Sequence, residues 1–349
     1  MSPSTSISPF SKAVVNAMRK LYPESLADKS FDNTGLLLEA PYDPNQNLND
    51  SVLITTDLTK AVADEAIARR DSIIVTYHPI IFRGLKSITL QDPQQTSLLR
   101  LAQAGISVYS PHTAVDAVPG GMADWLCDIV CGFIGSKEKP QLLGIKESSS
   151  LSKFYSLDVK YPQPSLGSVG KESEFPHTRE AIHPSPAPVP AGFEGAGAGR
   201  IVTFGTAQDL SVLIERIGEA TGWPGAISVA IPQGATIQSM KIRTVGVCPG
   251  SGGSVIMKSS GELPDLLFTG ELSHHEALAA IERGSAVITL FHSNTERGYL
   301  QNVLSKKLAD VIVEELGDSC RVPAESLVAV SQADRDPYGV VVLGDRVQG

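Results

Sequence analysis

Four short segments of this sequence hold five of its seven histidines, three of the segments also carry carboxylates, and each directly follows a predicted strand. Neutral imidazole and carboxylate groups together are typical ligands of zinc, iron or manganese, and without a nearby cysteine a thiolate site is not expected. Because the carboxyl ends of parallel strands lie along one edge of a sheet, side chains from distant segments can meet there. The residues are His78, His112 with Asp116, Glu271 with His274 and His275, and His292 with Glu296.

Two of these carboxylates are suited to holding a pair of metal ions. A carboxylate can bridge two ions whereas an imidazole nitrogen binds one, so Asp116 and Glu296 could hold ions roughly 3.5–4 Å apart. Such a pair lowers the pKa of a coordinated water and clamps an ester or amidine during hydrolysis. The segments therefore indicate hydrolytic metal chemistry.

Each segment also has a purely structural interpretation. His78 precedes a proline and could simply end its strand, and the spacing from His112 to Asp116 fixes little if that stretch is a loop. Asp57 follows another predicted strand, where it could cap the next helix or line the same cleft. The gathering of histidines at several strand ends favours a metal site over these separate explanations.

Two serine–glutamate pairs have the spacing of a helix capping box, in which the glutamate only completes the start of a helix. These pairs are Ser273 with Glu276 and Ser293 with Glu296. His292 and Glu296 share one face only if the last helix already begins at His292, which the capping interpretation disputes. Both interpretations stay open from the sequence.

A glycine-rich segment follows another predicted strand. Glycines let backbone N–H groups approach a ligand closely, so Gly250, Ser251, Gly252 and Gly253 are candidate binding residues for an oxyanion or phosphate beside the metal. The spacing matches neither the P-loop nor the dinucleotide-binding pattern. A tight turn is the structural alternative.

The elements that would position these residues alternate between strand and helix, which predicts βαβ units, a mainly parallel sheet and the α/β class. Apolar spacing near 3.6 marks helices and short buried apolar runs mark strands. Helices are predicted over residues 9–22, 59–70, 98–103, 210–221, 274–283 and 295–316, and strands over 51–56, 72–76, 107–109, 200–204, 227–231, 244–247, 265–269 and 286–290.

Composition divides the chain into parts. Residues 161–199 are rich in Pro, Gly, Ser and Ala, so they bury little apolar surface and are predicted to be an insertion or linker. We expect a disordered tail over 1–8, a first α/β lobe over 9–160 and a second over 200–349.

The overall numbers exclude several function classes. Hydrophobic residues make up 42% of the 349 residues, which is enough for a sizeable core. A formal charge of −9 argues against direct binding of nucleic acid. No apolar run reaches the eighteen or so residues of a membrane span. The four scattered cysteines fit a reduced, intracellular chain better than a disulfide framework.

Taken in order, the motifs resemble those of the NIF-three-like proteins, also labelled GTP cyclohydrolase I type 2-like. The resemblance covers about residues 9 to 345 without 162–196. It implies two α/β lobes with mixed, largely parallel sheets facing each other across a cleft with a dinuclear metal site, and a ring-shaped homohexamer. The motifs are FDNTGLL from Phe31, TYHPIIFR around His78, PHTAVD ending at Asp116, GSGG from Gly250, TGELSHHE around His275 and HSNTE from His292 to Glu296.

The resemblance implies His78, Asp116, His292 and Glu296 as metal ligands. Many members have His-His-Pro where this chain has Tyr77-His78-Pro79, a departure that resembles the eukaryotic branch of the family. A phenol is a poor zinc ligand near neutral pH because its pKa is about 10. We therefore expect one or two divalent ions (Zn, Fe or Mn) per chain, with the second ion bound more weakly unless His112 compensates.

Two functions are expected from these residues. The first is a metal-dependent hydrolase of a nucleotide-like or phosphorylated small molecule. Glu296 and Asp116 would fix the ions, His112 or His275 would move protons, and the turn Gly250–Gly253 would bind the anion. The alternative is a non-enzymatic, metal-holding homo-oligomer that binds protein partners such as transcription regulators. Either would act in the cytoplasm or in the mitochondrion.

Overall fold

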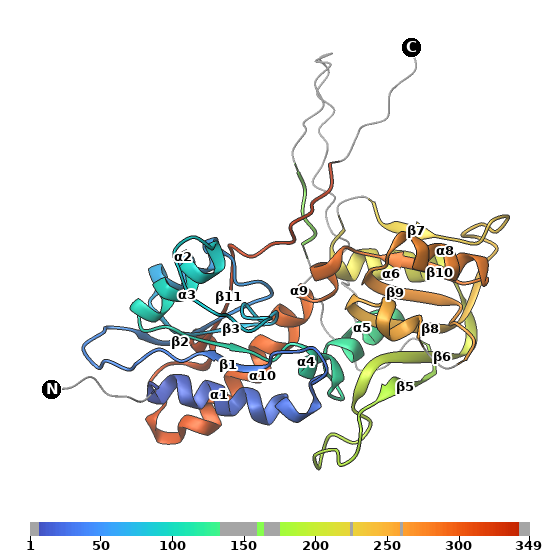
Figure 1. Cartoon of the computed structure of the whole chain (residues 1–349). Helices are drawn as coiled ribbons and strands as arrows, with labels where there is room; N and C mark the ends of the chain where they lie inside the picture. The colour runs from blue at the N-terminus through green and yellow to red at the C-terminus, as the bar shows by residue number, and fades with distance from the viewer. Residues whose placement is uncertain (1–6, 133–158, 164–174, 224–225, 259–260, 342–349) are drawn as a thin grey trace, which may run out of the picture. The chain divides into compact units, whose positions relative to one another are not determined.

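The computed structural model describes residues 7–132, 159–163, 175–223, 226–258 and 261–341. The chain forms two compact α/β units, each assembled from separate stretches of sequence (Figure 1). Unit 1 comprises Met1–Asp124, His183–Ala198 and Tyr299–Arg335, and unit 2 comprises Trp125–Ile182, Gly199–Gly298 and Asp336–Gly349. Most of the tail predicted at residues 1–8 lies outside the described residues.

Unit 1 is built on a five-stranded mixed sheet in the order β1-β4-β3-β2-β11. Strands β4, β3, β2 and β11 run parallel, and β1 is antiparallel to β4. All six residues of β3 are buried because helices cover both faces of this sheet. The strands are β1 (Gly35–Leu38), β2 (Asn49–Thr55), β3 (Asp71–Thr76), β4 (Ser107–Ser110) and β11 (Val328–Val330).

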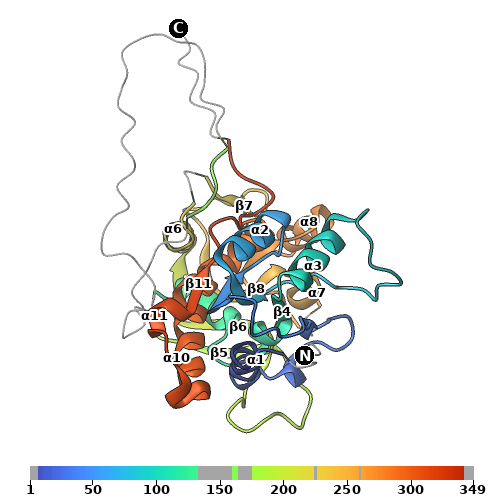
Figure 2. The ribbon, with the colours of Figure 1, turned by 90° about the vertical axis from the view of Figure 1, so that its left-hand side faces the viewer.

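Two layers of helices enclose the sheet of unit 1. Helices α1 and α10 lie on one face, and α2 and α3 lie on the other (Figures 1 and 2). The core between α2, α3 and the sheet contains Leu53, Val62, Ile74 and Leu101, all fully buried. The helices of this unit are α1 (Pro9–Leu21), α2 (Lys60–Arg69), α3 (Pro93–Gln103), α4 (Thr113–Ala117), α10 (Ser305–Leu316) and α11 (Ala324–Leu327), with 3₁₀ turns at Glu24–Leu26 and Gly317–Ser319.

Unit 2 is built on a six-stranded mixed sheet in the order β5-β6-β8-β9-β10-β7. Strands β8, β9 and β10 are parallel, whereas β6 and β7 are antiparallel to their neighbours β8 and β10. The strands are β5 (His177–Pro184), β6 (Gly197–Asp209), β7 (Ser228–Ala230), β8 (Lys241–Ser251), β9 (Leu266–Glu271) and β10 (Ala286–Thr289).

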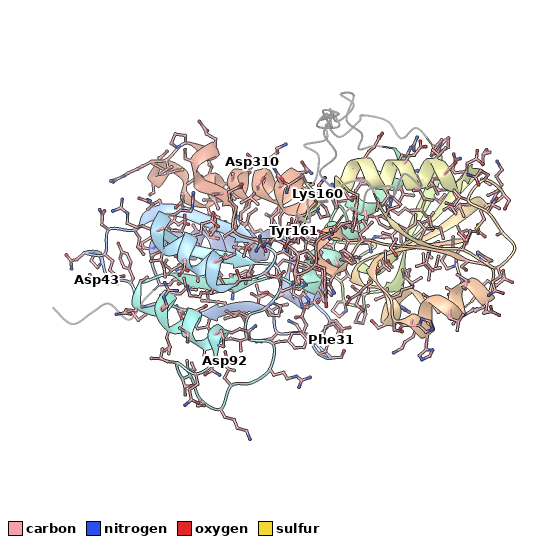
Figure 3. All side chains as sticks on the ribbon, turned by 90° about the horizontal axis from the view of Figure 1, so that it is seen from above. Phe31, Asp43, Asp92, Lys160, Tyr161 and Asp310 are labelled. Atoms are coloured by element: carbon pink, nitrogen blue, oxygen red, sulfur yellow. The ribbon has the colours of Figure 1, made fainter. Side chains whose placement is uncertain are left out.

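Helices also cover both faces of the sheet in unit 2. Ile256 and Ala280 pack with Leu267 and Val287 in one core, so α7 and α8 cover one face. Helix α6 lies on the opposite side of the sheet from α8 (Figures 2 and 3). The helical elements are α6 (Leu210–Thr221), α7 (Gly253–Ile256), α8 (His274–Glu282) and the 3₁₀ helix η2 (His292–Thr295), while α5 (Met122–Cys131) and α9 (Arg297–Tyr299) bridge the division between the units.

The α/β class with mixed, largely parallel sheets is confirmed, but the sequence analysis missed β1, β5 and β11. The long helix predicted over 295–316 is also interrupted, because a π-helical segment η3 (Leu300–Leu304) separates α9 from α10. Such segments are rare and frequently occur at functional sites. No helix among the described residues is long and apolar enough to cross a membrane.

The observed units differ from the predicted lobes at the C-terminal end. The stretch Tyr299–Arg335 belongs to unit 1 and not to a lobe spanning residues 200–349. The reason is packing, since α10 lies against α1, Lys20 pairs with Glu315, and the hydroxyls of Tyr22 and Tyr299 are 2.9 Å apart. Within the predicted insertion 161–199, β5 and the start of β6 are regular strands.

Candidate metal centre

The carboxyl ends of β2, β3 and β4 bring the predicted residues of unit 1 to one edge of its sheet. His78 follows β3, and its Nδ1 lies 2.9 Å from Oδ1 of Asp57, which follows β2. His112 follows β4, and its Nδ1 lies 2.6 Å from Oδ1 of Asp32. A carboxylate accepts the Nδ1 proton and so presents Nε2 as the metal-binding or basic nitrogen.

Asp116 lies on the short helix α4, where the sequence analysis expected a loop. The hydroxyl of Tyr77 donates to this carboxylate and lies 2.9 Å from both Oδ1 and Oδ2. The rings of Tyr77, His78 and His112 form one cluster, with centroids 4.8 to 5.5 Å apart. Three of the predicted residues of unit 1 therefore lie together at one edge.

His112 is held in an unusual backbone conformation, with φ of 36°. Non-glycine residues with positive φ cost free energy and cluster at functional sites. Asp32 holds this turn, since it also accepts hydrogen bonds from the backbone N–H and the hydroxyl of Thr113. Burial of Asp32 would raise its pKa, but the hydrogen bonds from His112 and Thr113 outweigh burial and lower the pKa below its ordinary value.

The carboxyl ends of β8, β9 and β10 form the corresponding edge in unit 2. His292 follows β10, and its Nδ1 lies 2.9 Å from Oε1 of Glu271 at the end of β9. Its Nε2 lies 3.5 Å from Oε1 of Glu296, whose side chain is 1% exposed. An imidazole nitrogen and a buried carboxylate oxygen at this separation are suited to binding one cation together.

The capping interpretation of Ser293 and Glu296 is wrong. The 3₁₀ helix η2 already begins at His292, so His292 and Glu296 face each other. The hydroxyl of Ser293 instead donates to Oδ2 of the buried Asp336 at 2.6 Å. Phe291, just before η2, has a φ of 64° and turns the chain so that His292 points to this edge.

Gly250 leaves the space that a metal ion at His292 and Glu296 needs. Its φ is +59°, and a Cβ there would lie 2.8 Å from Oε1 of Glu296 and 2.8 Å from Nε2 of His292. Thr295 accepts a hydrogen bond from the Gly250 N–H at 2.9 Å, and Thr269 donates to the Gly250 carbonyl at 3.0 Å. This close approach and the donor types fit a divalent cation.

The glycine segment fits the predicted anion site less well. The N–H of Gly250 donates to Thr295, and that of Gly252 donates to the carbonyl of Glu271. Both N–H groups are therefore already used in hydrogen bonds within the protein. The carboxylate of Glu276 fills the space over Gly253, where a Cβ would lie 2.1 Å from its Oε1. A negative charge there repels an anion, so a phosphate role for Gly250–Gly253 loses support.

The second capping box is present. Ser273 caps α8 and accepts from the Glu276 N–H, while the Glu276 carboxylate accepts from the Ser273 N–H. His275 lies in the first turn of α8 with its side chain exposed, and its ring contacts that of His274. Glu276 thus has a structural role, and His275 sits on the surface of the helix.

Sequence reasoning missed the residues that orient the histidines. Asp32 had no assigned role, Asp57 had only an alternative one, and Glu271 was one of several carboxylates in its segment. A carboxylate at each neighbouring strand end was the available signal. Gly270 was also missed, although a glycine inside a strand marks close backbone approach, and its Cβ would lie 2.5 Å from the carbonyl oxygen of His292.

These observations define an α/β protein with candidate metal donors, histidine and carboxylate side chains, at the carboxyl edges of its sheets. The sequence profile described as Duf34/NIF3 (NGG1p interacting factor 3) matches residues 11–320. The chain therefore belongs to the Duf34/NIF3 family, as the order of its motifs predicted.

The relatives match almost over their full length. "Protein NIF3 homolog" of Schizosaccharomyces pombe is 40% identical over 328 residues, which cover 94% of this chain and 96% of the relative. "NGG1-interacting factor 3" of Saccharomyces cerevisiae is 34% identical, covering 94% of this chain and 96% of the relative. "NIF3-like protein 1" of Homo sapiens is 28% identical, with 95% and 92% covered.

Solved structures share the fold. A Bacillus cereus protein related to NIF3 superposes with a TM-score of 0.63 at 20% identity, covering 95% of this chain and 98% of that one. Reduced HcgD from Methanocaldococcus jannaschii superposes with a TM-score of 0.54 at 17% identity, covering 91% and 96%.

Proposed function

We propose that this chain is a metal-dependent hydrolase that binds a divalent ion through His78, Asp116, His292 and Glu296. Its substrate in this proposal is a nucleotide-like or phosphorylated small molecule. The observation that carries the proposal is the repeated pairing of an imidazole Nδ1 with a carboxylate, which occurs at His78, His112 and His292. That pairing is the usual support of metal-binding histidines.

In this proposal, different residues have different roles in the reaction. A bound ion of the Zn, Fe or Mn type supplies Lewis acidity, which makes water a nucleophile near neutral pH. Asp57 and Glu271 fix the orientation of two imidazoles. His112, with Nδ1 held by Asp32, offers Nε2 as a proton acceptor, and its position beside His78 favours it over the exposed His275 as the residue that moves protons.

The number of ions follows from Tyr77. The phenol occupies both oxygens of Asp116 with a hydrogen bond, and it is a weak ligand in its neutral form. Bridging by Asp116 would compete with this hydrogen bond. We therefore propose one tightly bound ion per chain, with any second ion bound weakly.

A second candidate function comes from the name of one relative. The S. cerevisiae protein is named as an NGG1-interacting factor, which favours a metal-holding protein that binds protein partners such as transcription regulators. Metal exchange separates the two functions, because a structural ion sits in a closed coordination shell whereas a catalytic ion keeps an open position. Slow exchange together with full coordination would favour the partner-binding function.

The proposal also includes the oligomeric state of the protein and its compartment in the cell. The resemblance implies a homohexamer, and light scattering at about six times the 37.0 kDa chain mass would support it. Action in the cytoplasm or mitochondrion stays a prediction, and microscopy of the tagged protein tests it.

The decisive experiment compares two glutamate substitutions in unit 2. The protein is loaded with Zn, Mn or Fe in turn and assayed for hydrolysis of nucleotides, cyclic nucleotides and sugar phosphates. We expect turnover in at least one metal form and a loss of about a hundredfold in Glu296→Gln, the scale of one deleted active-site group. Glu276→Gln is the matched control, because glutamine keeps the capping box of α8. No turnover on any substrate, or full activity in Glu296→Gln, would overturn the proposal.

A further inference from the structure

Two aromatic side chains of unit 1 are exposed beside the histidine cluster. Phe31 is 52% exposed and Phe82 is 45% exposed, although large aromatic rings are normally buried. Their ring centroids lie 6.3 Å apart. We infer that this ring pair binds the planar aromatic ring of an anionic substrate, as in a nucleotide. The inference rests on the proposed function and names the part of the substrate that the chain recognises.

The ring pair lies next to His112, the residue proposed to move protons. The rings of Phe31 and Phe82 lie 6.4 and 6.3 Å from the ring of His112, both edge-on to it. The side-chain amide of Asn33 donates to the carbonyl of Ile81, which joins the loop of Phe31 to the loop of Phe82. A substrate ring stacked on this pair therefore lies next to His112.

The exposed faces of the two phenylalanines suit a flat ligand. Stacking of a base on an aromatic side chain contributes about 1–3 kcal/mol and tolerates different bases, because every base has a π-face. The rings are inclined at 44° to each other, and about half of each residue's surface is exposed. Figure 3 labels Phe31, and it shows a loop near Asp92 projecting from the helices of unit 1.

The charge of the same loop fits the anionic part of such a ligand. Arg83 directly follows Phe82, Lys86 lies three residues further on, and both are exposed. Within the part of the chain that the structure describes, neither forms an ion pair. Their charges attract the phosphate of such a ligand.

Binding to metal-free protein tests the inference without requiring hydrolysis. After removal of metal with a chelator, calorimetry measures binding of AMP, adenosine and ribose 5-phosphate. We expect AMP to bind most tightly, adenosine more weakly and ribose 5-phosphate weakest. Phe82→Leu and Phe31→Leu should each weaken AMP binding about 5- to 150-fold, the range that base stacking spans. Arg83→Ala should weaken AMP but not adenosine.

The matched control is Leu90→Ala, which alters the most exposed apolar residue of the same loop, at 73% exposure. It should leave AMP binding unchanged, and thermal melting should find all variants folded. Equal binding of AMP and ribose 5-phosphate, unchanged binding in both phenylalanine variants, or no binding of AMP at all would overturn the inference. A fall in oligomer mass in Phe82→Leu without a change in AMP binding would assign the rings to a subunit interface instead. If AMP binds through the rings but no metal form hydrolyses a substrate, only the proposed hydrolase fails.

Discussion

Tyr77 donates its hydroxyl to Asp116 and lies 2.9 Å from each of the two carboxylate oxygens. Because Tyr77 is buried, this hydrogen bond is shielded from water and holds the carboxylate in one orientation. Asp116 is thus bound to a phenol at the position where the resemblance described above implies a second histidine. The number of ions that we propose, one bound tightly per chain, rests on this pair.

Replacing Tyr77 with histidine should raise the metal content from one ion per chain to two. An imidazole is a far better ligand than a neutral phenol, and it leaves Asp116 able to bridge. Elemental analysis after equilibration with excess Zn or Mn and desalting measures the ratio. Tyr77→Phe is the control, since it removes the hydroxyl without adding a ligand and should stay at one ion or fewer. Two ions already in the unaltered protein would contradict this prediction.

Gly250→Ala should abolish metal binding at His292 and Glu296. The added Cβ would lie 2.8 Å from the donor atoms of both residues, and the neighbouring backbone is held by Thr269 and Thr295. The matched control is Gly234→Ala, where φ is +85° and nothing lies within 4 Å. Both should lose about 1–2 kcal/mol of stability from the left-handed backbone, but only Gly250→Ala should lose the ion. Calorimetric titration with Zn and urea unfolding separate the two effects, and equal metal affinity in both variants would count against the site.

Protein stability should fall steeply as the pH rises above about 10, because the buried Tyr22 must stay neutral in the folded state. Burial raises the pKa of Tyr22 well above its ordinary value, against a small lowering by the hydrogen bond with Tyr299. A raised folded pKa contributes stability that is complete below the unfolded pKa of about 10 and is lost as the pH rises towards the folded pKa.

Urea unfolding between pH 7 and pH 11 measures this dependence. Tyr22→Phe should cost about 1 kcal/mol at pH 7 from the lost hydrogen bond, and it should make the fall at high pH shallower. Tyr338→Phe is the control, because Tyr338 is 68% exposed and should leave the profile unchanged. The same steep fall in Tyr22→Phe as in the unaltered protein would refute this explanation.

One thiol should react in the native protein and four in the unfolded chain. Cys127, Cys131 and Cys248 are buried, whereas Cys320 is partly exposed. Burial also raises the pKa of the Cys131 thiol to about 11, which removes its reactive thiolate at pH 8. Titration with a chromogenic disulfide reagent at pH 8 counts the groups, and Cys320→Ser should reduce the native count to zero. Fast reaction of a second thiol would show that a buried element opens readily.

The sequence by itself was enough to predict the α/β class and the placing of the histidine segments at the carboxyl ends of strands. Helix α6 and strand β3 follow from their apolar patterns alone, because spacing near 3.6 and a short continuous apolar run are local properties. The histidine segments at strand ends were likewise readable, since the carboxyl edge of a parallel sheet gathers them without further information.

Tertiary structure alone decided which of the open interpretations held. Ser273 became a helix cap, while Ser293 with the same spacing turned to Asp336, because that partner lies 43 residues away in the sequence and no local pattern marks it. The placement of Tyr299–Arg335 in unit 1 likewise depends on the packing of α10 against α1. Local spacing determines on which face of a helix or strand a side chain lies. Its interaction partner depends on contacts with residues distant in the sequence.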